Sequence, residues 1–134
     1  MKINLDVAQK MIDAAIKEAQ SMSILCSVAI ADENGWLIAL HRMDGALIPT
    51  VDIARDKAWT AAAFKMPSSE VTRFGDPSRP DFGFNTQNWN DRLTTIPGGL
   101  PIKNGSEVIG AVGVSGGTPQ QDVVVSETAL LESR

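Results

Sequence analysis

The sequence predicts a single α+β domain in which helices cover an antiparallel sheet. Two tight turns carry this prediction, because residues 32–35 and the pair Asn104-Gly105 each separate two apolar segments. Short turns join antiparallel strands, whereas parallel strands need a long crossover. The predicted order is helix, two strands, one or two helices, three strands and a helix, which is typical of an α+β protein rather than of a doubly wound one. A length of 134 residues fits one domain, residues 1–134.

The N-terminal third predicts a helix followed by a β-hairpin. Asn4 suits the N-cap of a helix that ends near Ser21, because apolar residues recur after it at helical spacing. Residues 25–31 and 36–43 then form two strands, and Gly35 supplies the positive φ that the turn between them needs. Alternation on the second strand places one set of side chains on one face, Leu37, Ala39 and His41, and the other set on the opposite face, Trp36, Ile38, Leu40 and Arg42.

The middle of the chain predicts a helix over residues 51–65 that begins at Pro49 or Thr50. Lys57 lies on or beside a stripe of alanines that would let this helix approach the sheet closely. Ser68 is the predicted N-cap of a short helix that follows. Residues 74–92 are polar and show no clear periodicity. A segment of this length is long for a loop. The aromatic residues within them are expected to contact a neighbouring subunit, or else to line a pocket: Phe74, Phe82, Phe84 and Trp89.

The C-terminal part predicts a strand over residues 93–96, a hairpin and a last helix. The hairpin strands are residues 100–103 and 107–115, and Asn104-Gly105 is the dipeptide that a type I′ turn prefers, with positive φ at both residues. Glycine weakens a strand unless another segment must approach its backbone, so Gly110 and Gly113 indicate close packing. Thr118 is the predicted N-cap of a helix over residues 119–132, with Pro119 at its first position.

Composition narrows the classes of function. A net charge of −4 and a pI near 4.9 disfavour nucleic acid as a partner. No apolar run reaches the roughly 18 residues that span a bilayer. The N-terminus lacks a signal-peptide core, so we expect a cytoplasmic protein. The single cysteine, Cys26, lies in an apolar strand and is expected to be buried and inert.

Several catalytic and binding motifs are missing from the sequence. There is neither a P-loop nor a dinucleotide-binding fingerprint, because the glycines at 110 and 113 lack a third glycine at the required offset. Ser115 does not lie in a Gly-x-Ser-x-Gly elbow, which disfavours a Ser-His-Asp hydrolase. One cysteine and one histidine are too few for a structural zinc site.

Four segments in order resemble one known family. They are residues 42–46 (RMDGA), 54–58 (ARDKA), 97–102 (PGGLPI) and 110–117 (GAVGVSGG), the last followed by Gln121-Asp122. Together they are similar to the GlcG/HbpS family, also called the haem-degrading domain family, which includes the C-terminal domain of PduO-type proteins. The resemblance covers essentially the whole chain. It implies a profilin-like, five-stranded antiparallel sheet flanked by helices, homo-oligomers built from dimers up to octamers, and haem as a ligand that some members degrade.

The candidate site residues fall into a charged group and a glycine group. Arg42, Asp44 and Lys57 are the charged residues expected to meet, where they would hold a carboxylate or form a structural ion pair. Asp122 lies in the first turn of the last helix, where it would complement the helix dipole or contact a ligand. The glycine group would offer backbone N–H groups to an anion, or would only form tight turns: Gly98, Gly99, Ser115, Gly116 and Gly117.

His41 is the only histidine, so it is the candidate haem ligand or general base, against the alternative of a structural histidine on a strand. Met22, Met43 and Met66 are further possible haem ligands, although methionines more often fill gaps in a core. A Cys-x-x-Cys-His motif is absent, which excludes covalent attachment of haem.

Three hypotheses follow. The first, which the resemblance favours, is an oligomer that binds haem or another tetrapyrrole, with its propionates on Arg42, Lys57 and backbone N–H groups and its ring between aromatics of residues 74–92. The second is a catabolic enzyme for a carboxylate or a diol-derived compound, in which Arg42 anchors the substrate and Asp44, Lys57 or His41 moves a proton. The third is a non-catalytic accessory or sensing subunit. The residues alone favour a generic site for a small anionic ligand.

Overall fold

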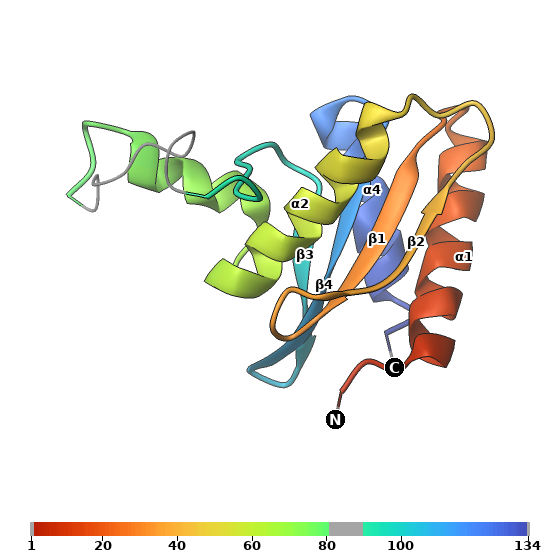
Figure 1. Cartoon of the computed structure of the whole chain (residues 1–134), viewed down its shortest axis with the longest axis horizontal. Coiled ribbons are helices and arrows are strands. Elements are labelled where there is room, and N and C mark those ends of the chain that lie inside the picture. Colours follow the sequence, from red (N-terminus) through yellow and green to blue (C-terminus); the bar gives the residue numbers. More distant parts are fainter. Residues whose placement is uncertain (1, 81–89, 134) are drawn as a thin grey trace.

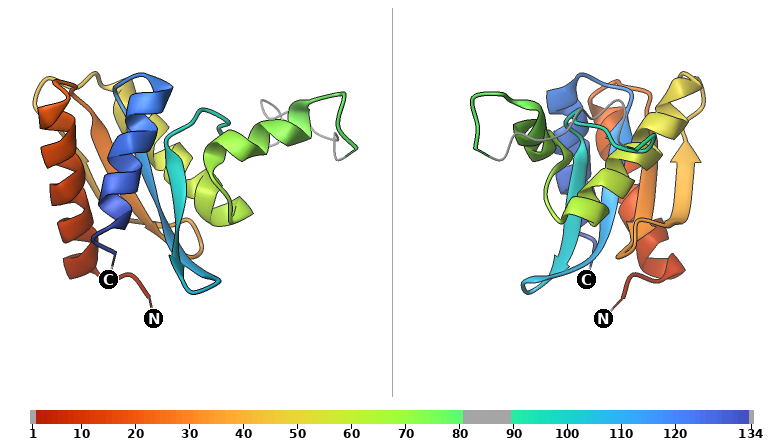
Figure 2. Two further views of the ribbon diagram at one scale, coloured as in Figure 1. Left: turned by 180° about the vertical axis from the view of Figure 1, so that it is seen from behind. Right: turned by 60° about the vertical axis from the view of Figure 1, so that its left-hand side comes forward.

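The computed structural model describes residues 2–80 and 90–133, which form an α+β fold. The elements are α1 (Leu5–Ser21), β1 (Ser27–Asp32), β2 (Leu37–Arg42), α2 (Pro49–Phe64), η1 (Ser68–Gly75), β3 (Gly99–Asn104), β4 (Glu107–Ser115) and α4 (Pro119–Leu130). The sheet in this part of the chain is antiparallel and has four strands in the order β2-β1-β4-β3. Figures 1 and 2 show α1 and α4 on one face of the sheet and α2 on the other.

The two faces of the sheet bury different side chains. Val28 and Ile30 of β1 point toward α1 and α4, into a core of isoleucine, valine and methionine. Ala29 and Ala31 point the other way and meet the alanine stripe of α2. Successive side chains of a strand alternate between faces, so one strand serves both layers. The small residues on the second face bring α2 close to the sheet.

The close approach of α2 depends on glycine at two strand positions. A Cβ added at Gly113 would overlap the Ala54 carbonyl, and one at Gly99 would overlap the Lys57 carbonyl. The prediction that Gly113 marks a close approach is therefore confirmed. The main chain of α2 lies directly on β4 and β3, which brings the Lys57 side chain to the end of the sheet.

The helix caps follow the sequence. Val7 N–H donates to Asn4 Oδ1 at 2.9 Å, as expected for the N-cap of α1. Thr118 and Gln121 form a capping box at the start of α4, where Pro119 occupies the first turn. The predictions for Asn4 and Thr118 are confirmed, because these signals depend on a few neighbouring residues only.

Residues 93–96 do not form the predicted strand, so the described sheet has four strands and not five. Side chains provide their hydrogen-bond partners. Thr94 N–H donates to Thr60 Oγ1 at 3.0 Å, and the Ile96 carbonyl accepts from Ser68 Oγ at 2.7 Å. The segment therefore runs as an irregular link from the region of η1 to β3.

Two smaller predictions were also wrong. Ser68 does not cap a helix, since its hydroxyl accepts from Gly99 N–H at 3.0 Å while it donates to Ile96. In the second hairpin, Asn104 pairs with Glu107 and only Gly105 has a positive φ, of 65°. The turn is therefore centred on Gly105 and Ser106, one residue later than the sequence suggested.

The predicted irregular segment, residues 74–92, begins at the end of η1, which extends away from the sheet (Figures 1 and 2). Phe74 lies in η1 and packs against Phe64, with ring centroids 5.9 Å apart. Phe82, Phe84 and Trp89 lie outside the described residues, and so does the prediction that they contact a subunit or line a pocket. No helix in the described part of the chain has both the length and the apolar character needed to cross a bilayer.

Candidate functional site

A buried ion pair lies where α2, β4 and α4 meet. Lys57 is 1% exposed, and its Nζ donates to the Val114 carbonyl at 2.7 Å and to Asp122 Oδ2 at 3.0 Å. The other oxygen of Asp122, Oδ1, accepts from Gly117 N–H at 2.9 Å. Because α2 and α4 cover opposite faces of the sheet, this pair connects the two layers around the end of β4.

Burial shifts the proton affinity of two groups in this cluster. It lowers the pKa of Lys57 below its ordinary value, although the Asp122 carboxylate opposes that shift. Burial also raises the pKa of the Cys26 thiol to about 11, and the charge of Asp122 adds to the effect. Cys26 is fully buried, which confirms the first part of its prediction.

Gly98 and Gly99 form a buried corner around this ion pair. The Gly98 carbonyl accepts from Val114 N–H at 3.0 Å and from Ser126 Oγ at 2.6 Å. Gly98 has a φ of +128°, and a Cβ there would lie 2.9 Å from Lys57 Nζ. The corner is therefore filled by the lysine side chain, and glycine at this position makes room for it.

The end of β2 borders a recess of about 450 Å³ that contains four of the predicted residues: His41, Arg42, Met43 and Asp44. His41 is half-buried and pairs across the sheet with Val28, while Arg42 and Asp44 are exposed. Arg42 forms no ion pair with any residue of the described ranges. The recess is completed by α1 and the segment after it, through Ile16, Gln20 and Leu25.

A second recess, of about 570 Å³, adjoins the first at Leu25. We call the two together the Leu25 cleft. Leu25 is 49% exposed and Leu47 is 74% exposed, so one side of the cleft is apolar, and Ile48 beside Leu47 is also 74% exposed. The residues that line the second recess are Ser23, Ile24, Leu25, Gly45, Ala46, Leu47, Gly116, Gly117, Thr118 and Gln121.

At the second glycine corner, Gly116 and Gly117, two backbone N–H groups already have partners. Gly117 N–H donates to Asp122, and Thr118 N–H donates to Gln121 Oε1 at 2.9 Å. These two groups are therefore engaged within the protein. An anion in the Leu25 cleft would instead meet the Arg42 guanidinium, which is the charged donor among its lining residues. Ser115, next to this corner, is buried and pairs with Ser27 of β1.

The structure thus divides the predicted residues into two groups. His41, Arg42 and Asp44 share the Leu25 cleft with Gly116 and Gly117. The remaining residues form the buried frame behind it: Lys57, Gly98, Gly99, Ser115 and Asp122. Lys57 pairs with Asp122 and not with Arg42 or Asp44.

The apolar side of the cleft was not anticipated from the sequence. Leu47 and Ile48 are adjacent apolar residues in the turn before Pro49, outside any helical or strand pattern. An apolar pair outside the spacing of a helix or strand does not fit a core. Its position was therefore the signal in the sequence for an exposed apolar surface.

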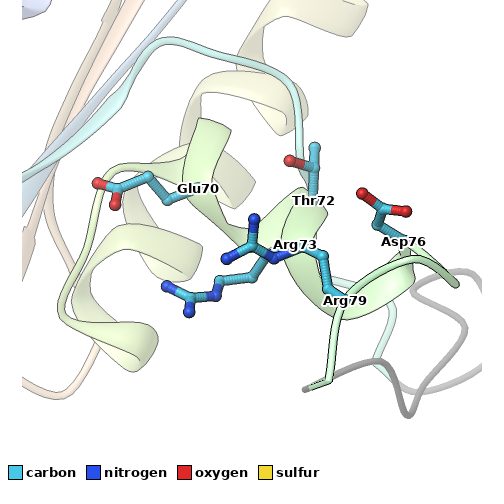
Figure 3. A pocket seen from close by; sticks show the side chains of 5 residues that line it. All are labelled: Glu70, Thr72, Arg73, Asp76 and Arg79. Carbon is cyan, nitrogen blue, oxygen red and sulfur yellow. The ribbon is translucent and has the colours of Figure 1, made fainter.

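Another recess, of about 300 Å³, lies on η1 and the turn after it (Figure 3). It is lined by Glu70, Thr72, Arg73, Asp76 and Arg79, none of which the sequence analysis proposed. Asp76 Oδ1 accepts from Ser78 N–H and from Ser78 Oγ, which lowers the pKa of that carboxyl. Among residues 2–80 and 90–133, no three His, Cys, Asp or Glu side chains gather to hold a metal ion.

The comparisons with known proteins agree on one family. The family model of haem-degrading HbpS-like proteins matches residues 3–131 of the sequence. A 15.0 kDa protein of Citrobacter freundii, named for the dhaT–dhaS intergenic region, is 36% identical over 96% of this chain and 89% of its own length. The corrinoid adenosyltransferase PduO of the same organism is 28% identical over 97% of the chain, but the chain spans only 38% of PduO.

Solved structures show the same fold. A PduOC complex with haem has a TM-score of 0.90 at 27% identity, over 98% of this chain and 95% of that one. A double mutant of HbpS from Streptomyces reticuli has a TM-score of 0.86 at 26% identity, over 98% of this chain and 86% of that one.

Proposed function

The chain belongs to the family of haem-degrading HbpS-like proteins, and from that premise we propose that it binds haem in the Leu25 cleft. A relative with the same fold, PduOC, has been solved as a complex with haem. The observation that carries the proposal for this chain is the composition of the cleft, where exposed apolar side chains adjoin an imidazole and an arginine.

The residues of the cleft fit the chemistry of haem. A haem ring needs apolar walls, and Leu25 and Leu47 offer exposed apolar surface. Its propionates need a cation, and a guanidinium such as that of Arg42 matches a carboxylate with two donors. Its iron needs an axial ligand, for which His41 provides an imidazole nitrogen. Met43 is a poorer candidate, because its sulfur already accepts from Cys26 N–H at 3.4 Å.

Bound haem would supply a redox-active iron, while the protein would hold and orient the group. In this proposal His41 binds the metal, Arg42 holds a propionate and Asp44 borders the entrance. Gly116 and Gly117 form a wall without side chains. The buried frame of Lys57 and Asp122 keeps that wall in place through the hydrogen bond to Gly117.

The same family supports three further proposals. They are the profilin-like form of this α+β fold, homo-oligomers built from dimers up to octamers, and a cytoplasmic location. The exposure of Leu47 and Ile48 is consistent with a surface that a ligand or another copy covers. Light scattering of the protein with and without haemin would measure the oligomer and its dependence on the ligand.

Haemin titration followed by absorbance tests the main proposal. We expect a saturable Soret band, and a loss or shift of that band in His41→Ala. Thr72→Ala is the control, since Thr72 is exposed and lies in the recess on η1. Absence of a saturable band in the wild type would overturn haem binding, whereas an unchanged band in His41→Ala would overturn only the role of His41.

A second candidate function is binding of a small carboxylate by an enzyme or accessory protein. The exposed Arg42 guanidinium favours it, since it forms no ion pair with the described residues and would anchor any carboxylate. Asp44 or His41 would then move a proton, because Lys57 is buried against Asp122. Glycolate should raise the melting temperature without haem, glycolamide should not, and Arg42→Gln should remove the difference. Equal effects of the two compounds would contradict it.

A further inference from the structure

A recess of about 240 Å³ lies at the opposite end of β2 from the Leu25 cleft. The strand begins at Leu37, which lines this recess, and ends at Arg42, which lines the cleft. Its walls come from the β1–β2 turn, the start of β2, α2 and the segment that leads to β3. Its lining residues are Gly35, Trp36, Leu37, Arg55, Trp59 and Arg92.

Two indole rings make its apolar walls. Trp59 of α2 packs on the turn, where a Cβ at Gly35 would lie 2.7 Å from Trp59 Cδ1. Gly35 has a φ of +86°, so both its conformation and its lack of a side chain hold the turn against Trp59. Trp36 is 61% exposed, and Leu37 is 46% exposed. The recess therefore has one aromatic wall fixed against the turn and one that is largely exposed.

Two arginines supply positive charge at the same place. The Arg92 guanidinium lies 5.2 Å from the centre of the Trp36 ring. Its backbone is anchored, because Arg92 N–H donates to Asn90 Oδ1 at 2.8 Å and the Arg92 carbonyl accepts from Thr60 Oγ1 at 3.3 Å. Within residues 2–80 and 90–133, Arg92 forms no ion pair.

Arg55 is only weakly neutralised. Its Nη2 lies 3.7 Å from Asp52 and 3.5 Å from Asp56, and its side chain is 45% exposed. These contacts are long and the guanidinium is half-exposed, so they contribute little, and a ligand carboxylate can compete for the guanidinium. Burial also raises the pKa of the Asp56 carboxyl, because it disfavours the charged form.

We propose that this recess binds a small aromatic carboxylate, with its ring against the indoles of Trp36 and Trp59 and its carboxylate on Arg55 and Arg92. The volume is below the range of about 300–1,000 Å³ typical of drug-sized ligands, which points to a single ring. An aromatic cation is the competing occupant, because Asp52 and Asp56 lie nearby. The guanidinium of Arg92 already holds the position over Trp36 that such a cation would take.

The test compares three probes with one ring each: benzoate, neutral benzamide and cationic benzylamine. Trp36 and Trp59 are two of the three tryptophans of the chain, so indole N–H signals in NMR report on the recess directly. We expect benzoate to shift two indole signals saturably. We expect benzamide and benzylamine to bind at least about tenfold more weakly, because neither offers an anion to the guanidiniums.

Arg92→Gln should weaken the binding of benzoate by about tenfold and leave the binding of benzamide unchanged. The control Lys103→Gln should alter neither affinity. Haemin binding should be unaffected in Arg92→Gln, since the Leu25 cleft lies at the other end of β2. The experiments therefore test this proposal independently of haem binding. Tighter binding of benzylamine than of benzoate would overturn the proposal of an aromatic carboxylate in this recess. So would equal binding of benzoate and benzamide, or no saturable shift in the wild type.

Discussion

Lys57 Nζ and Asp122 Oδ2 lie 3.0 Å apart, and the two side chains are 2% and 3% exposed. The pair joins α2 to α4 across the end of the sheet. Removing one partner leaves the other charge buried without compensation, which costs about 3–5 kcal/mol. We expect Asp122→Asn and Lys57→Met each to lower the free energy of unfolding by about this amount, as measured by unfolding in urea.

The double variant Lys57→Met/Asp122→Asn should lose less stability than the sum of the two single variants, because neither charge is then left alone. Arg55→Gln is the control, since its ion pair with Asp52 is exposed and should contribute less than about 1 kcal/mol. Additive losses in the double variant would show that the pair is not coupled.

Cys26 should make the protein less stable as the pH rises from about 9 to about 11. Its pKa is raised from 9.0 to about 11, chiefly by burial, so the folded state keeps a proton that the unfolded chain has lost. The stabilisation is therefore complete below pH 9 and disappears through pH 11, a change of roughly 2–3 kcal/mol.

Urea unfolding between pH 8 and pH 11 measures this effect, with Cys26→Ala as the reference. The wild type should lose more stability over this range than the variant does. Parallel pH profiles would mean that the thiol titrates alike in the folded and unfolded states.

Gly113→Ala should destabilise the fold, because its Cβ would overlap the Ala54 carbonyl and push α2 away from β4. Backbone shifts of this kind cost about 1–3 kcal/mol, and occasionally more. Gly75→Ala is a matched control, since nothing lies within 4 Å of the added Cβ. Thermal unfolding of the two variants would reveal the difference, and equal melting temperatures would contradict the close approach of α2.

Much of the fold could be predicted because its signals are local. Asn4 caps α1, Thr118 caps α4, and residues 107–115 form β4 with the predicted bounds. Residues 93–96 have the composition of a strand, but Thr60 and Ser68 provide their partners. Those contacts are made by side chains more than 25 positions away, and no local pattern encodes them.

The candidate site shows the same limit. The sequence suggested that Arg42, Asp44 and Lys57 meet, but only Arg42 and Asp44, which are close along one strand end, share the cleft. Lys57 and Asp122 are separated by 65 positions, so nothing local indicates that they form the buried pair. Likewise, Leu25 and Leu47 border one recess only because the two loops that carry them are adjacent in the folded chain.

Arg42→Gln should weaken haemin binding, and most strongly at low salt. The Arg42 side chain is exposed at the Leu25 cleft, where it would pair with a propionate at the protein surface. Such a pair is screened by salt, so the wild type should lose affinity as ionic strength rises, while the variant should respond less. We expect about a tenfold loss of affinity at low salt, as measured by absorbance titration, and partial recovery in Arg42→Lys. Lys103→Gln, which removes an exposed charge from β3, should bind haemin like the wild type. If the two glutamine variants lose affinity equally, haemin responds to the net charge of the protein and not to a guanidinium in the cleft.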